Sequence, residues 1–167
     1  MTYTTRIDLP PMVRQQIVKL LQQRLNDAID LEAQLKHAHW NVKGPQFFQL
    51  HQLFDALHDD IEGAVDLIAE RITALGGMAD GRLSSVVKGT SLASYPLGAR
   101  GGAAHLDAIA SALSRFGVGM RQDTEVASHL GDTGTSDLFT QLSRETDKLL
   151  WLTEATLDEA DGGEVDA

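Results

Sequence analysis

The sequence predicts an all-α protein, a bundle of four long helices with one long connection in the middle of the chain. Apolar residues recur at spacings of three and four over long stretches, as they do on one face of an α-helix. Between residues 76 and 102 this periodicity stops, in a segment rich in Gly and Ser. A connection of that length is unusual in a compact domain unless it crosses from one end of a bundle to the other.

Proline and glycine mark the expected ends of the helices. The Pro-Pro pair that starts at Pro10 fits a first helical turn, and the Gly-Pro pair that starts at Gly44 cannot continue a helix. Within the third helix, Gly117 and Gly119 each weaken the helix by about 1 kcal/mol relative to Ala. The expected ranges are 1–10 for an N-terminal tail, 11–42, 46–75, 103–130 and 134–159 for the helices, 76–102 for the crossover with a short helix at 84–88, and 160–167 for an acidic tail. Two helical hairpins joined by one long crossover make a single ferritin-like four-helix bundle.

Charge and composition argue against several classes of protein. The formal net charge of −10 disfavours nucleic acid as the default partner, because phosphate contacts need clustered Lys and Arg. It suits a cationic partner, although a merely solvated acidic surface gives the same charge. The chain has no cysteine, which excludes disulfides and thiolate metal sites. No signal-like or membrane-spanning apolar stretch is present, so we expect a cytoplasmic protein without a membrane partner.

One face of the second helix carries His, Asp and Glu side chains and no Lys or Arg. At about 100° per residue, these groups fall within about 120° of one another. Such a face is either a solvated acidic surface, the commoner case, or a cation site, because its carboxylates lack the usual i,i+4 partners. Its members are His51, Asp55, His58, Asp59, Glu62, Asp66 and Glu70.

The spacing of two pairs on this face indicates how a metal site could be built. His51 and Asp55 are one turn apart, as are Asp66 and Glu70, but Asp55 and Asp66 are separated by about 16 Å of helix. Metal–ligand bonds are only about 2–2.5 Å long, so there are two poor sites or a second copy supplies the missing half. The two pairs are symmetric about the point between residues 60 and 61. A two-fold axis there would create two identical shared sites.

His39 adds a third ligand to the first pair. The turn at Gly44 folds the first helix back on the second, which brings residue 39 near residue 51. His37 cannot share this role, because side chains two residues apart on a helix point about 200° apart.

Several motifs resemble the Dps family, the miniferritins known as DNA-binding proteins from starved cells. They are "HWNVKGPQFFQLHQLFD" (39–55) and "DLIAERITALGG" (66–77), with Tyr95-Pro96-Leu97 and "DKLLW" (147–151) as weaker ones. The resemblance covers essentially the whole chain. It implies a hollow homo-dodecamer built from C2 dimers, which oxidises Fe(II) with hydrogen peroxide in preference to O2, stores a ferric core and protects DNA from oxidative damage.

The resemblance also implies roles for individual residues. Iron ligands would be His39, His51 and Asp55 from one subunit, with Asp66 and Glu70 from its neighbour. Zn²⁺ or another divalent cation could occupy the same sites. Trp40 would lie beside the centre, where family members place a Trp that gives up an electron; the alternative is a packing residue at a helix end.

Other acidic and histidine side chains lie outside this set of iron ligands. Asp132 and Asp137 resemble positions that line the pores through which iron enters the cage, and the alternative is that they cap a helix. His58, Asp59 and Glu62 are interpreted as tuning the centre or binding extra cations. His105 and His129 are expected at the surface or at helix ends.

Some Dps members bind DNA through a Lys-rich tail, which this chain lacks. Its first thirteen residues contain only Arg6 as a basic group, and its C-terminal tail is acidic. We therefore expect weak or absent DNA binding and assign no DNA-binding residue. The alternatives to a ferroxidase are a DNA-compacting structural protein, a redox-silent metal buffer, and a larger ferritin or di-iron oxygenase. The last class carries Glu-x-x-His pairs, and this sequence contains none.

Overall fold

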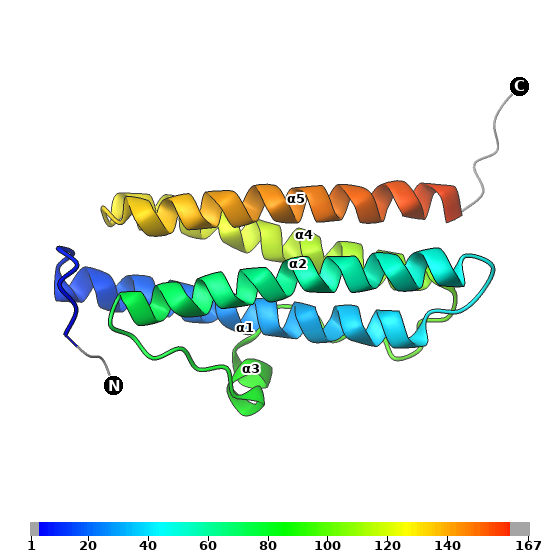
Figure 1. Ribbon diagram of the computed structural model, residues 1–167, viewed down its shortest axis with the longest axis horizontal. Helices are drawn as coiled ribbons and strands as arrows, with labels where there is room; N and C mark the ends of the chain where they lie inside the picture. The colour runs from blue at the N-terminus through cyan, green and yellow to red at the C-terminus, as the bar shows by residue number, and fades with distance from the viewer. Residues whose placement is uncertain (1–3, 161–167) are drawn as a thin grey trace, which may run out of the picture.

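The protein is a bundle of four long α-helices with one short helix in the crossover, as a computed structural model of residues 4–160 shows (Figure 1). Residues 1–3 and 161–167, which include part of both expected tails, lie outside the described residues. The elements are α1 (Pro11–Asn41), α2 (Phe47–Ala74), α3 (Leu83–Gly89), α4 (Gly102–His129) and α5 (Thr133–Ala160). No strand occurs among the described residues, so the predicted all-α fold class is confirmed. None of these helices is long and apolar enough to cross a membrane.

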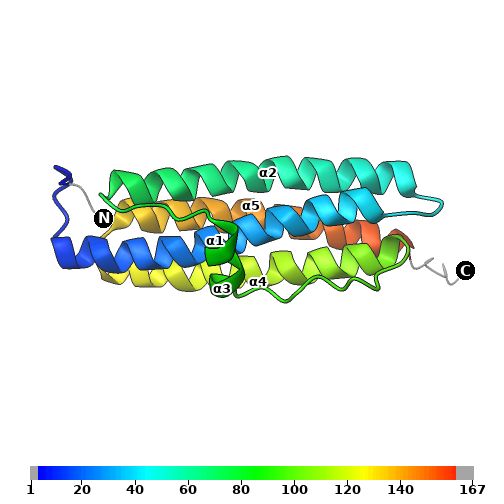
Figure 2. The same cartoon turned by 90° about the horizontal axis from the view of Figure 1, so that it is seen from below.

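The helices form two antiparallel hairpins, α1 with α2 and α4 with α5 (Figures 1 and 2). Because α2 and α4 run in the same direction, the segment between them travels the length of the bundle. The turn between α1 and α2 contains Gly44 at φ 114°, and α2 is followed by Gly76 at φ 83°. Residues other than glycine rarely adopt this left-handed region of backbone conformation, so both turns depend on glycine.

A continuous apolar core fills the space between the hairpins. Phe54 of α2, Phe116 of α4 and Phe139 of α5 are fully buried within it. Fully burying a side chain of this kind stabilises the fold by about 1.5–3 kcal/mol. The core therefore fixes which face of α2 points inward and leaves the polar face of α2 outside the apolar core.

Polar side chains on α1 hold the crossover against the bundle. The backbone N–H of Ser91 donates to Asp27 at 2.6 Å, and the Gln23 amide donates to the Gly89 carbonyl at 2.6 Å. These bonds satisfy backbone groups in a segment that has little secondary structure of its own.

A buried ionic cluster explains one of the two glycines in α4. Arg24 contacts Asp27 and Asp123, each at 3.1 Å, and the contact with Asp123 is an ion pair without hydrogen-bond geometry. A Cβ on Gly119 would lie 1.6 Å from the Arg24 guanidinium, whereas a Cβ on Gly117 would meet nothing closer than 3.4 Å. Gly119 therefore has a packing role, because the absence of a side chain at this position leaves space for the Arg24 guanidinium.

His105 departs from the expectation of a surface or capping position. It is 1 % exposed, and its Nδ1 lies 2.6 Å from the Tyr95 hydroxyl of the crossover. Burial raises the pKa of Tyr95 to about 12 and lowers the pKa of His105. The pair joins the crossover to α4 beneath the surface. His129 does lie exposed at the end of α4, where its Nδ1 hydrogen-bonds the Glu125 carbonyl.

Candidate metal centre

The turn between α1 and α2 brings the rings of His39 and His51 into contact. The ring centroids are 3.6 Å apart and the planes differ by 22°. The Nδ1 of His39 lies 2.8 Å from the His51 carbonyl, and the Nδ1 of His51 lies 2.9 Å from the His39 carbonyl. A carbonyl can only accept, so each Nδ1 carries the proton and each Nε2 keeps a lone pair available for a metal ion.

Asp55 lies one helical turn beyond His51 and beside His39. Its Oδ1 is 3.7 Å from the His39 Nδ1 and 2.5 Å from the ammonium of Lys36 on α1. The hydrogen bond from Lys36 holds the pKa of Asp55 below its ordinary value, and the positive charge of the same ammonium acts in the same direction. The carboxylate is therefore ionised near neutral pH, with a lysine as its counter-ion.

Lys36 is the residue at this site that sequence reasoning missed. The acidic face of α2 carries no basic residue of its own, but the partner of Asp55 comes from the neighbouring helix. Lys36 precedes His39 by one helical turn, so both lie on the side of α1 that faces α2. That spacing was the signal that could have revealed it.

Asp66 and Glu70 lie further along α2, exposed and one turn apart. Because α2 is one continuous helix, about 16 Å of it separates Asp55 from Asp66. The chain therefore brings together His39, His51 and Asp55 but not the two distal carboxylates. Trp40 is 70 % exposed, so it does not pack into the core of its own chain.

Asp132 and Asp137 occupy different environments. Asp132 is 2 % exposed, accepts hydrogen bonds from the backbone and hydroxyl of Thr135, and pairs with Arg71 at 2.8 Å. These contacts are those of a residue that caps the start of α5, which fits the second of the two sequence interpretations. Asp137 is exposed on α5, and its pore role stays a prediction.

Comparisons with known proteins identify the family of the fold. The model of the ferritin-like domain family matches residues 18–162. The DNA protection during starvation protein of Agrobacterium fabrum is 37 % identical over 158 residues, which cover 95 % of this chain and 98 % of that protein. A Dps structure from Mycobacterium smegmatis superposes with a TM-score of 0.88 at 30 % identity, over 96 % of this chain and 98 % of the other.

A Dps protein from Vibrio cholerae, described as a member of a broad superfamily of ferritin-like diiron-carboxylate proteins, superposes with a TM-score of 0.86. It is 27 % identical and covers 94 % of this chain and 98 % of its own. The fold and the histidine–carboxylate site thus define a ferritin-like bundle protein. Within that class, the chain belongs to the Dps family.

Proposed function

We propose that the protein is a ferroxidase that oxidises Fe(II) and stores the ferric product inside a hollow oligomer. The observation that carries the proposal is the His39–His51 pair, in which both Nδ1 atoms are held by carbonyls and both Nε2 atoms are left for a metal. The ionised carboxylate of Asp55 beside them supplies an oxygen ligand. Imidazole and carboxylate together suit Fe(II), and the same set accepts Zn²⁺.

The second half of each centre would come from another copy of the chain. Asp66 and Glu70 are too far along α2 to reach their own His51. The two pairs are symmetric about the point between residues 60 and 61, so an antiparallel α2 from a two-fold-related copy would place the partner subunit's Asp66 and Glu70 at the site. Such an interface generates two identical centres per dimer. Six dimers would make the dodecamer that the family resemblance implies.

This ligand set fits a centre that iron must leave as well as enter. Iron has to bind, change oxidation state and move to the mineral, and a closed thiolate or all-nitrogen cage would hold it too firmly. Each hydrogen peroxide takes two electrons, one from each of two Fe(II) ions, and consumes two protons to yield two waters. Two-electron reduction in this manner avoids the hydroxyl radical that a one-electron step releases. We propose that Trp40, an exposed residue that follows His39 in the chain, donates an electron to an oxidant that the iron has reduced only partly.

Lys36 has a specific part in this proposal. Its ammonium holds Asp55 ionised and oriented, and an incoming cation would replace it as the counter-ion. Exchange of one cation for another keeps the local charge balanced during iron entry and exit.

Protection of DNA is the second function to weigh, since the Agrobacterium relative is named for it. We propose that the protein acts in the cytoplasm and protects DNA by removing iron and peroxide rather than by compacting DNA. The net charge of −10 disfavours direct contact with phosphates.

The test is Fe(II) oxidation after anaerobic loading, started with peroxide, together with size analysis of the protein. His51→Ala and Asp66→Ala should both slow the oxidation and leave the assembly size unchanged. Asp60→Asn is the matched control. Asp60 is an exposed acidic residue of α2, but it lies about 100° round the helix from Asp59 and is therefore outside the face that carries the ligands. The proposal fails if the protein is a monomer, or if both ligand variants oxidise iron as fast as the control.

A further inference from the structure

We propose that His58, Asp59 and Glu62 of α2 form a second divalent-cation site, which Glu32 of α1 orients. The ligand set lies within one chain, and its place at the dimer interface rests on the proposed function. The site would take a borderline cation such as Zn²⁺, Mn²⁺ or Fe(II), since it mixes imidazole with carboxylates.

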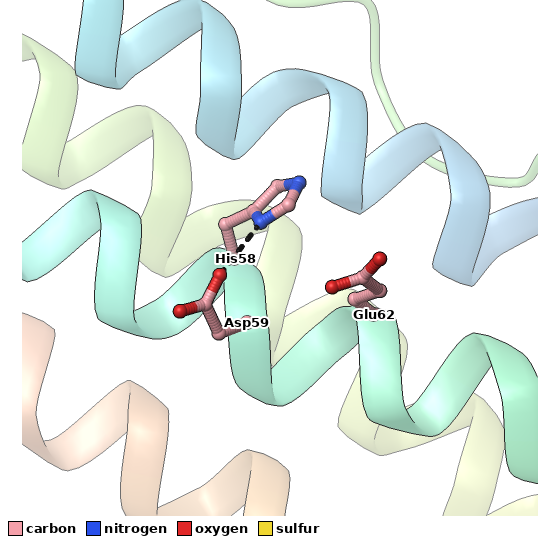
Figure 3. A group of neighbouring side chains, drawn as sticks. All are labelled: His58, Asp59 and Glu62. Carbon is pink, nitrogen blue, oxygen red and sulfur yellow. Dashed lines mark hydrogen bonds and ion pairs between the residues drawn. The ribbon is translucent and has the colours of Figure 1, made fainter.

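The three side chains converge on one point beside α2 (Figure 3). Each offers one ligand atom, and these atoms all lie within 4.8 Å of one another. The His58 side chain is 12 % exposed and thus held in place, whereas Asp59 and Glu62 are exposed and free to adjust by the small amount that a metal requires. A cluster with one fixed imidazole and two adaptable carboxylates suits a labile metal site.

The carboxylates on both sides of the His58 ring are the observation that points to a cation. The Nδ1 of His58 hydrogen-bonds a carboxylate oxygen of Asp59 at 3.2 Å, and its Nε2 makes an ion-pair contact of 3.3 Å with a carboxylate oxygen of Glu32. A protonated imidazole can donate to both acceptors, whereas a neutral imidazole has one N–H and directs the lone pair of its other nitrogen at an anion. A metal ion bound to that nitrogen would supply the positive charge that a proton supplies in its absence.

Glu32 indicates which nitrogen binds the metal. Metal-binding histidines commonly donate their second N–H to a carboxylate, which fixes the tautomer and the ring orientation. In the metal-bound form, Nε2–H would donate to Glu32, which lies 3.3 Å away, and Nδ1 would bind the metal together with Asp59 and Glu62.

The position along α2 places this site next to the proposed iron centre and at the middle of the dimer. His58 is one helical turn beyond Asp55, or about 4.5 Å along the helix, and about 10 Å beyond His51. Asp59 and Glu62 are equidistant from the point between residues 60 and 61, so the same two-fold axis would set Asp59 opposite the partner subunit's Glu62. Four carboxylates would then meet on faces that carry no Lys or Arg, and bound cations would remove their repulsion.

The test counts Zn²⁺ bound to the purified oligomer by equilibrium dialysis and calorimetry. We expect His58→Ala with Glu62→Gln to lose at least one Zn²⁺ per dimer, while Asp60→Asn binds as the parent does. Glu32→Gln should keep the site and weaken its Zn²⁺ affinity by about 10- to 100-fold. Zinc stoichiometry and affinity unchanged in the double variant would overturn the proposal. If that variant does not assemble, Glu62→Gln alone replaces it in the same comparison.

A further variant separates this inference from the proposed function. His51→Ala with Asp66→Ala should lose the zinc of the iron centre and retain that of the His58 site. If this variant binds as much zinc as the parent while the His58 variant loses it, the iron centre is wrong and the second site stands. The opposite pattern retains the iron centre and rejects the second site.

Discussion

Gly119 is the position where a single added methyl should damage the fold most clearly. In Gly119→Ala the new Cβ would lie 1.6 Å from Nη1 of Arg24, so the guanidinium must move away. Arg24 then leaves Asp27 and Asp123, two carboxylates that are buried in the bundle. Asp27 keeps its hydrogen bonds from the backbone and hydroxyl of Ser91 in the crossover, so Asp123 is the charge left without a partner.

The magnitude follows from two opposing effects. Leaving a buried charge unpaired costs about 3–5 kcal/mol, and we take the lower end because only one carboxylate is orphaned. Replacing glycine by alanine inside a helix returns about 1 kcal/mol. The net loss is about 2 kcal/mol in the free energy of unfolding, or about 4–8 °C in Tm for a chain of this size. Gly117→Ala, in ordinary van der Waals surroundings, should instead raise Tm by about 2–4 °C.

Thermal unfolding followed by circular dichroism at equal protein concentration measures both variants. The loss in Gly119→Ala should also depend on pH. Burial raises the pKa of Asp123 in the folded chain, so this carboxyl disfavours folding increasingly as pH rises above the ordinary Asp range. Displacing Arg24 raises that pKa further, so the loss should be larger at about pH 8 than at about pH 5. Equal Tm values for the two glycine variants would refute the reasoning.

Three further predictions concern function. Lys36→Met removes the counter-ion of Asp55, so the pKa of Asp55 should return toward its ordinary value. Calorimetry should show tighter Zn²⁺ binding, because the metal no longer has to replace the lysine. Unchanged or weaker Zn²⁺ binding would contradict this. Asp132→Ala should lower Tm, because it removes a buried helix cap and an ion pair with Arg71. Asp137→Ala should leave Tm unchanged and slow iron uptake if Asp137 lines a pore. A lower Tm in Asp137→Ala, or slower iron uptake with unchanged Tm in Asp132→Ala, would count against these assignments. Gel-shift assays at about 150 mM salt should show no DNA complex, and a stable complex would contradict the charge argument.

The fold class could be predicted because it depends on local features of the sequence, namely the spacing of apolar residues and the glycines in the turns. Helical periodicity fixes the apolar faces, and the turns that follow α1 and α2 contain Gly44 and Gly76 in left-handed conformations that other residues resist. The contact of His39 with His51 was predictable for the same reason, since a short turn superposes the helices that carry them.

Contacts between helices that are distant in sequence could not be predicted in this way. Lys36 reaches Asp55, Glu32 reaches His58, and Arg24 occupies the space of Gly119. Periodicity shows which side of a helix faces inward but not which residue of the next helix it meets. For Asp132 the sequence allowed two interpretations, and only its burial against Arg71 distinguishes them.

Each proposed iron centre is built from two chains, and co-assembly of two inactive variants tests this arrangement. A chain with His51→Ala and a chain with Asp66→Ala are co-expressed, and Fe(II) oxidation by the mixed oligomer is compared with that of each variant alone. In a mixed dimer, one centre carries both substitutions and the other carries neither. Random pairing at equal expression leaves about a quarter of all centres intact, so the mixture should recover about a quarter of the parent rate. No recovery in a properly mixed assembly would contradict the shared centre.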